Sequence, residues 1–361
     1  MTNHPKISPA FAEYMARCGP NDTREALVIY DAPLPDNMAS FAPGADSSQR
    51  AYVRDVAAVN KAVQAESRAD YHNKTAKLLP RPTTARSGTV TQAVGNNALP
   101  VYQAQVTKRT LPLLARQNNV VAVLPNQKIQ LIRPKAIEFK DLAQQEGDAG
   151  YTWGLQKLRI PELWEKAKTK GQGIKVAVLD TGVHGVHPAL AGRVDSFIMM
   201  DAQGRRIAAQ PSFDTDTHGT HVCGTIAGNN VQGVAIGVAP EVKLLVGCVL
   251  PGGSGNLQML LEGITWAVEQ GAHIISMSLG FTYYEPLFAR VFDMLINRYN
   301  ILPVVAIGNE NHGNMSSPGS ASNAFSIGAA ELEKDDKLSV SFFSSGASLI
   351  FPGATPPTRI D

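Results

Sequence analysis

The pattern of apolar residues changes character after residue 150. Four short, almost continuous apolar runs predict strands that are buried on both faces of a parallel sheet: GIKVAVLDTG, VKLLVGCVL, HIISMSLG and ILPVVAIGN. Between these runs, apolar residues recur at helical spacing over residues 257–272 and 285–300. Because strands alternate with helices, the pattern predicts an α/β domain over residues 151–361 with a doubly wound, mostly parallel sheet.

The first part of the chain has a different texture. It predicts a strand over residues 23–33, a helix within 49–79, a strand over 99–110, a short helix at 111–117 and either two short strands or one bent strand within 119–132. This order is typical of a small α+β unit, which we place at residues 1–134. The charged residues 135–150 are predicted to form an exposed linker between the two domains.

Composition narrows the class of protein. The chain has 361 residues, of which 44% are hydrophobic and 18% charged, so a sizeable core is expected. A net charge of +2 gives no electrostatic reason to expect nucleic acid or an anionic membrane as a partner. Three cysteines exclude a disulfide scaffold, and the first residues lack the pattern of a secretory signal, so a reducing, cytoplasmic setting is expected.

Three polar side chains follow predicted strands or open a predicted helix. Asp180 ends VAVLD, His218 opens HGTHVCGTIAG, and Asn309 lies in AIGNEN. Each alone is typical of a cap or turn, but the carboxyl ends of parallel strands meet at one edge of a sheet. Most of an acyl-transfer site consists of three groups: an acid that orients an imidazole, a His that moves a proton, and an amide that donates a hydrogen bond to an oxyanion.

Other chemistries fit the sequence less well than acyl transfer. His218 and His221 are three residues apart and could bind a metal, but a third ligand and an HExxH arrangement are lacking. The sequence also has no P-loop and no GxGxxG that opens a helix after a strand. Cys223 lies five residues after His218, about 140° around the helix, and is expected to be a small buried residue rather than a nucleophile. Its closeness to His218 still suggests that thiol reagents could inhibit the protein.

Residues 153–352 resemble the subtilisin-like serine proteases, or subtilases, in continuous order. VAVLDTGVHGVHPAL is similar to the segment with the catalytic Asp, HGTHVCGTIAG to the one with the catalytic His, and AIGNEN to the oxyanion segment. The resemblance therefore implies that Asp180, His218 and Asn309 hold these roles. GGSG and SMSLG resemble the two backbone segments that bracket an extended substrate, which implies binding by Gly253, Ser254, Gly255, Ser278, Leu279 and Gly280.

The resemblance also implies a function and a role for the first domain. It implies a serine endopeptidase that cuts peptide or protein substrates with broad specificity, since main-chain pairing does not read side chains. The chemistry needs no cofactor; structural calcium is a further expectation of the family, without ligands that the sequence can place. Subtilases commonly carry an N-terminal α+β propeptide, which implies that residues 1–134 assist folding and act as an intramolecular inhibitor, with processing within 133–150.

One part of the family's pattern is missing. The nucleophile of subtilases lies in Gly-Thr-Ser-Met-Ala or a close variant, and we find no such segment. Ser344, Ser345 and Ser348 follow a region that resembles the one before this motif, but none has the right neighbours. We therefore expect the domain to be incomplete at its C-terminus and this chain alone to be inactive. The alternative is a non-catalytic pseudo-protease that binds extended peptides.

Overall fold

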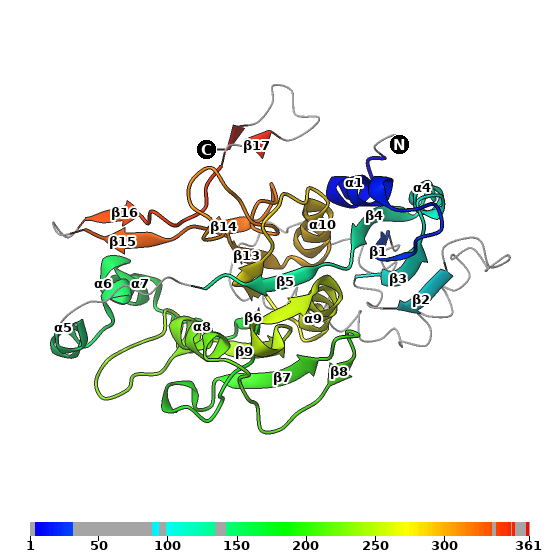
Figure 1. Cartoon of the computed structure of the whole chain (residues 1–361). Helices are drawn as coiled ribbons and strands as arrows, with labels where there is room; N and C mark the ends of the chain where they lie inside the picture. Colours follow the sequence, from blue (N-terminus) through cyan, green and yellow to red (C-terminus); the bar gives the residue numbers. More distant parts are fainter. Residues whose placement is uncertain are drawn as a thin grey trace.

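The structure is a computed structural model that describes residues 4–31, 89–93, 99–133, 142–333, 337–347, 349–350 and 359–360. Figure 1 shows a large sheet with helices against it and a smaller N-terminal sheet beside it. The helix predicted within residues 49–79 lies outside the described residues, as do residues 135–141 of the linker predicted at 135–150; the rest of that linker is described and forms the helix α5 (Leu142–Ala149).

A seven-stranded sheet forms the centre of the molecule, with the strand order β14-β13-β11-β6-β9-β7-β8. Every neighbouring pair is parallel except β7 and β8, which confirms the predicted doubly wound, mostly parallel sheet. The strands are β6 (Lys175–Asp180), β7 (Val194–Met200), β8 (Arg206–Ile207), β9 (Lys243–Cys248), β11 (Ile274–Met277), β13 (Leu302–Ala306) and β14 (Phe325–Ile327).

The two predicted helices are α9 (Leu257–Glu269) and α10 (Phe288–Tyr299). The Asn256 side chain starts α9 by accepting a hydrogen bond from the backbone N–H of Met259 at 3.0 Å. Residues 257–268 are all buried, so α9 is covered on every side rather than along one stripe. The other helices of this region are α5 (Leu142–Ala149), α6 (Trp153–Lys157), α7 (Ile160–Ala167) and α8 (His218–Ala227), with single turns η2 (Pro188–Leu190) and η3 (Pro251–Gly253).

The described part of the N-terminal unit is an antiparallel sheet in the order β2-β3-β1-β4 with helices α1 and α4. The predicted strands are β1 (Arg24–Tyr30), β3 (Val101–Val106) and β4 (Val120–Pro125), and the predicted short helix is α4 (Thr110–Ala115). The sequence did not predict α1 (Pro9–Arg17) or β2 (Thr89–Ala93). The signal for α1 is Ser8, whose hydroxyl accepts a hydrogen bond from the N–H of Phe11.

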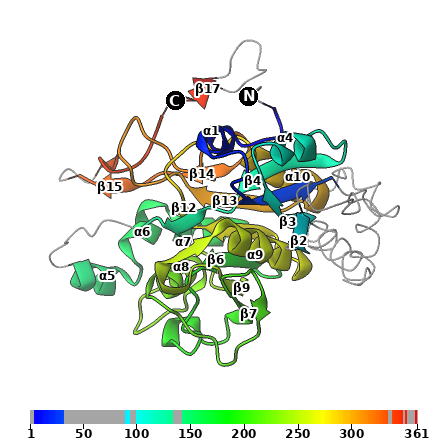
Figure 2. The ribbon, with the colours of Figure 1, turned by 45° about the vertical axis from the view of Figure 1, so that its right-hand side comes forward.

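Alternation along β1 gives this small sheet two apolar faces. Val28 packs in one buried cluster with Met15 of α1, whereas Leu27 belongs to the large cluster that also contains Leu261 of α9. Both views show the N-terminal sheet beside α9 and α10 (Figures 1 and 2). One face of the N-terminal unit therefore shares its core with the large domain.

The strand β5 (Lys128–Leu131) leaves the N-terminal unit and lies between two strands of the large domain. It is antiparallel to both β10 (Ser254–Asn256) and β12 (Leu279–Gly280), with Ile129 opposite Gly255 and Gln130 opposite Gly280. The backbone N–H of Ile132 continues this pairing by donating to the carbonyl of Ser278 at 3.0 Å. Residues from the N-terminal part thus complete a sheet of the second domain; the predicted division at 134 and 150 stays a prediction.

Beyond β14 the described elements are short. They form two antiparallel pairs, β15 (Ala330–Leu332) with β16 (Leu338–Val340), and β17 (Leu349–Ile350) with β18 (Arg359–Ile360). None of the helices in the described parts of the chain is long and apolar enough to cross a bilayer.

We predict that the shared core contributes measurably to stability. Leu124 of β4 is fully buried in the cluster that includes α9, so Leu124→Ala should lower the free energy of unfolding by about 2–5 kcal/mol in urea titrations. Leu113→Ala, in the same unit but 53% exposed, is the matched control and should change it by less than about 0.5 kcal/mol. Equal effects of the two variants would contradict a shared core at β4.

Candidate active site

Asp180 is the last residue of β6, in the middle of the large sheet. Residues 176–179 before it are buried apolar side chains, so the strand is fixed on both faces. The Asp180 side chain is itself fully buried, and its Oδ1 accepts a hydrogen bond from the backbone N–H of Thr181 at 2.8 Å. A carboxylate in such a place needs strong donors, because an unpaired buried charge is costly.

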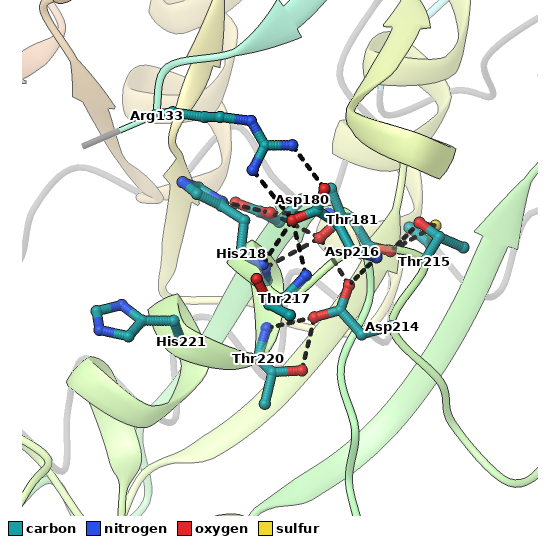
Figure 3. Close-up of polar contacts among 12 residues, drawn as sticks. Arg133, Asp180, Thr181, Asp214, Thr215, Asp216, Thr217, His218, Thr220 and His221 are labelled. Carbon is teal, nitrogen blue, oxygen red and sulfur yellow. Dashed lines mark hydrogen bonds and ion pairs between the residues drawn. The ribbon is translucent and has the colours of Figure 1, made fainter. Parts of the chain in front are cut away.

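His218 supplies the second donor. It is the first residue of α8, is 8% exposed, and its Nδ1 lies 2.8 Å from Asp180 Oδ1 (Figure 3). The structure thus brings together the two side chains that the sequence selected. With Nδ1–H donating to the carboxylate, Nε2 carries the lone pair, which is the tautomer that a general base needs.

The surroundings of the imidazole shift the pKa of His218 in opposing directions. Burial disfavours the imidazolium, but the hydrogen bond from His218 to Asp180 and the negative charge of Asp180 outweigh it, so the pKa of His218 is raised above its ordinary value. Asp180 therefore orients the ring and also stabilises its protonated form.

A further carboxylate, which sequence reasoning missed, ties the two elements together. Asp214 Oδ1 accepts from the hydroxyl of Thr181 at 2.7 Å, and its Oδ2 accepts from the backbone N–H and the hydroxyl of Thr220 at 2.7 and 2.6 Å. It thereby joins the turn after Asp180 to the first turn of α8. Its signal in the sequence is an acid four residues before His218, which is too common a spacing to select it.

The turn and the helix approach so closely that only glycine fits between them. A Cβ at Gly219 would lie 2.1 Å from the carbonyl oxygen of Gly182. This contact explains why a glycine directly follows His218, since a side chain there would push the imidazole away from Asp180.

Asn309 lies at the end of β13, after Gly308. Its Nδ2 donates a hydrogen bond to the backbone carbonyl of Arg133, just beyond β5. The guanidinium of the same Arg133 contacts Asp216, two residues before His218. Arg133 therefore links Asn309 to the His218 segment, and the end of β5 lies between them.

The predicted substrate-binding residues line the same place. Ser254 and Gly255 belong to β10, Leu279 and Gly280 form β12, and both strands pair with β5. Gly253 ends η3 directly before β10, and the Ser278 carbonyl accepts from Ile132. The two segments thus lie on either side of β5, which is an extended chain paired with both.

The remaining candidates do not join the pair. Ser344 and Ser345 are buried, and their hydroxyls accept from the backbone N–H groups of Ala329 and Glu310. Ser348 lies outside the described residues. His221 points away from His218 (Figure 3), and the described residues contain no group of three or more His, Cys, Asp or Glu side chains arranged to hold a metal ion. No calcium ligands can be assigned among them.

Comparison with known proteins identifies the class that this fold and site define. The chain belongs to the subtilase family, whose model matches residues 171–358. It is 37% identical over 191 residues to the major intracellular serine protease of Bacillus subtilis (strain 168), covering 50% of this chain and 58% of that protein. It is 34% identical over 204 residues to Subtilisin Savinase of Lederbergia lenta, covering 56% of this chain and 71% of that protein.

A solved structure supports the fold. Fervidolysin from Fervidobacterium pennivorans, a keratinolytic enzyme related to subtilisin, aligns with 92% of this chain and 48% of its own at a TM-score of 0.59 and 21% identity. The chain spans 58% of the length of the Bacillus subtilis relative, so only part of that protein has a counterpart here.

We predict that Asp180 controls the titration of His218. In Asp180→Asn the charge is lost while burial remains, so the pKa of His218 should fall below its ordinary value instead of lying above it. A raised pKa means that this contact stabilises the fold at low pH and that the contribution is lost as the pH rises through the folded-state pKa. NMR titration of the imidazole in both proteins tests this; an unchanged midpoint would contradict the assigned pair.

The cysteines near the site yield a second prediction. Cys223 and Cys248 are fully buried, and burial raises the pKa of Cys223 well above its usual range and that of Cys248 to about 11. Thiolate is therefore scarce at both, and maleimide should label the partly exposed Cys18 first. Mass spectrometry of native protein should find Cys223 unmodified until denaturant is added; rapid native labelling of Cys223 would instead support the thiol sensitivity expected from the sequence.

Proposed function

We propose that this chain carries the acid, the base and the oxyanion donor of a serine endopeptidase that cuts extended peptides. The observation that carries the proposal is the Asp180–His218 hydrogen bond beside a groove in which β5 is held as a third strand between β10 and β12. Family membership supports serine protease chemistry, and several relatives are named as serine or alkaline proteases.

In the proposed mechanism, a serine hydroxyl attacks the carbonyl carbon of the scissile bond while His218 Nε2 accepts its proton. The carbonyl oxygen becomes an oxyanion, to which the Asn309 amide donates a hydrogen bond without burying a charge. His218 then protonates the leaving amine, and an acyl-enzyme remains. Water, deprotonated by His218, attacks the carbonyl carbon of this ester; the acyl–oxygen bond breaks and His218 returns the proton to the serine oxygen. Asp180 stabilises the imidazolium in each half-reaction, so these steps need no cofactor.

The nucleophile is taken to be a serine outside residues 1–361, because no segment of this sequence has the family's motif and the hydroxyls of Ser344 and Ser345 serve the backbone. The proposal thus includes inactivity of the 361 residues alone. Extended peptide and protein substrates are expected to bind as β5 does, through main-chain pairing with β10 and β12.

The N-terminal region is proposed to be an intramolecular inhibitor, so that the protein is made as a zymogen. Three observations support this role: β5 occupies the groove, the Arg133 carbonyl accepts from Asn309, and the N-terminal sheet shares a core with α9. Processing is proposed to fall within residues 133–150, which follow the groove.

A reducing, cytoplasmic setting is proposed as well. All three cysteines are free thiols, and two of the relatives, from Bacillus subtilis and Paenibacillus polymyxa, are named as intracellular serine proteases. Structural calcium remains a prediction from the family without a ligand set.

The test supplies the missing serine segment from a relative and measures whether the resulting protein cuts peptides. Fused after Asp361, the C-terminal part of the Bacillus subtilis relative that carries its serine should yield hydrolysis of a fluorogenic peptide and a cut within residues 133–150. His218→Ala should reduce both rates by about 10²- to 10⁴-fold, because general acid–base catalysis is lost. His312→Ala, at an exposed histidine, is the matched control and should leave them unchanged.

Two results would overturn the proposal. Peptide hydrolysis by the unfused chain that survives His218→Ala would show that the site lies elsewhere. A folded fusion that binds the peptide but neither hydrolyses it nor cuts itself would favour the pseudo-protease, which holds extended peptides without cleavage.

A further inference from the structure

An ion pair joins residue 133, just after β5, to the His218 segment. Arg133 Nη1 donates to Asp216 Oδ1 at 3.1 Å, and Nη2 donates to Oδ2 at 2.6 Å (Figure 3). Two parallel hydrogen bonds of this kind match the planar guanidinium to a carboxylate in both position and orientation. The contact is therefore specific in geometry, although Arg133 is an exposed side chain.

The same carboxylate is also held by its own backbone. Asp216 Oδ1 also accepts from the backbone N–H of Thr217 at 2.7 Å and from that of His218 at 3.2 Å. The hydrogen bond from Arg133 and then those from the two N–H groups hold the pKa of Asp216 far below its usual range, so the group is charged at every relevant pH. Of its described contacts, Oδ2 has only Arg133 as a partner.

The groove also leaves room for a guanidinium at this point. Gly253, with φ of 85°, lies beside the ion pair: a Cβ on it would be 3.1 Å from Arg133 Nη2 and 4.0 Å from Asp216 Oδ2. Any side chain at 253 would crowd the bound cation. The Arg133 guanidinium thus pairs with the Asp216 carboxylate on one side and lies beside the backbone of Gly253 on the other.

We propose that Asp216 is a specificity-determining residue that selects substrates with a cationic side chain, arginine above lysine, at the position that Arg133 occupies. This inference rests on the proposed function, since it takes β5 and the residues after it to lie as a substrate does. Pairing with β10 and β12 reads only the main chain, and Asp216 adds selection of one side chain. A neutral or acidic residue there leaves the carboxylate unpaired or repelled.

The alternative is that Asp216 only holds the turn before α8. The turn uses Oδ1, whereas Arg133 uses both oxygens. Asp216→Asn separates the two roles, because its amide oxygen still accepts from the backbone N–H groups while the charge and the second acceptor are lost. A purely turn-forming role predicts that Asn and Asp are equivalent toward a cationic chain in the groove.

The first measurement uses the full chain and its own residue 133 as the probe. Hydrogen exchange of the Ile132 amide, which donates to Ser278, reports opening of the groove segment. Arg133→Gln and Asp216→Asn should each speed exchange by about fivefold, and the double variant should add nothing further. Arg133→Lys should lie between. Asp195→Asn, a carboxylate on β7, is the control.

The second measurement tests selection in trans. The full chain carries Arg133→Glu, so that repulsion between Glu at position 133 and Asp216 weakens the binding of β5 and the residues after it. This variant is titrated with a fluorescent peptide of sequence Lys-Ile-Gln-Leu-Ile-Arg and with a second peptide that has citrulline, isosteric but neutral, in place of the arginine. The arginine peptide should bind about fivefold more tightly, and adding Asp216→Asn should abolish the difference. Equal affinities of the two peptides, or a preference that survives Asp216→Asn, would overturn the proposal. If neither peptide binds, the hydrogen-exchange measurement decides: additive effects of Arg133→Gln and Asp216→Asn would overturn the proposal.

Neither measurement involves hydrolysis. A fusion protein that fails to cut peptides refutes the proposed catalysis while an Asp216-dependent preference persists. Conversely, normal His218-dependent hydrolysis without charge selection refutes only the role of Asp216.

Discussion

The hydrogen bond between Asp180 and His218 is the contact on which the rest of the structure depends. Asp180 is a fully buried ionisable acid at the end of the central strand of the large sheet. Such a group is tolerated only with fixed donors, and His218 is the one that can also exchange a proton. The Asp214 network and the close approach at Gly219 both serve to hold α8 where its first residue meets that acid.

A second constraint is that the groove is built from unpaired strand edges. β10 and β12 satisfy their backbone groups by pairing with an extended chain, and in this structure that chain is β5. In the proposed function, the same geometry serves inhibition when the chain is the protein's own and substrate binding when it is foreign. Because backbone pairing is indifferent to side chains, selectivity has to come from groups at the rim, of which Asp216 is the charged one beside His218.

Most of the large domain was predictable because its strands are continuous apolar runs. β6 and β9 are buried on both faces, as their continuous apolar residues, such as Val176–Leu179, predict. β11 and β13 instead alternate between buried and partly exposed residues, so the predicted burial on both faces was wrong for these two strands. β7, β8 and β14 were missed because they are partly exposed or very short, so neither an alternating nor a continuous apolar pattern marks them. In the N-terminal unit, α1 escaped notice because its helical signal is one capping serine and a single turn of apolar residues.

The sequence alone selected the candidate residues Asp180, His218 and Asn309, since they stand near the ends of recognisable strands or at the start of a helix, in segments that resemble those of subtilases. It could not reveal Asp214 or Asp216, whose roles exist only because the turn after β6, the start of α8 and residue 133 converge from distant parts of the chain. Nor could it place β5 in the groove. Local patterns record which face of an element is buried, whereas the partner of a strand edge or of a charge is decided by tertiary packing, which joins residues far apart in sequence.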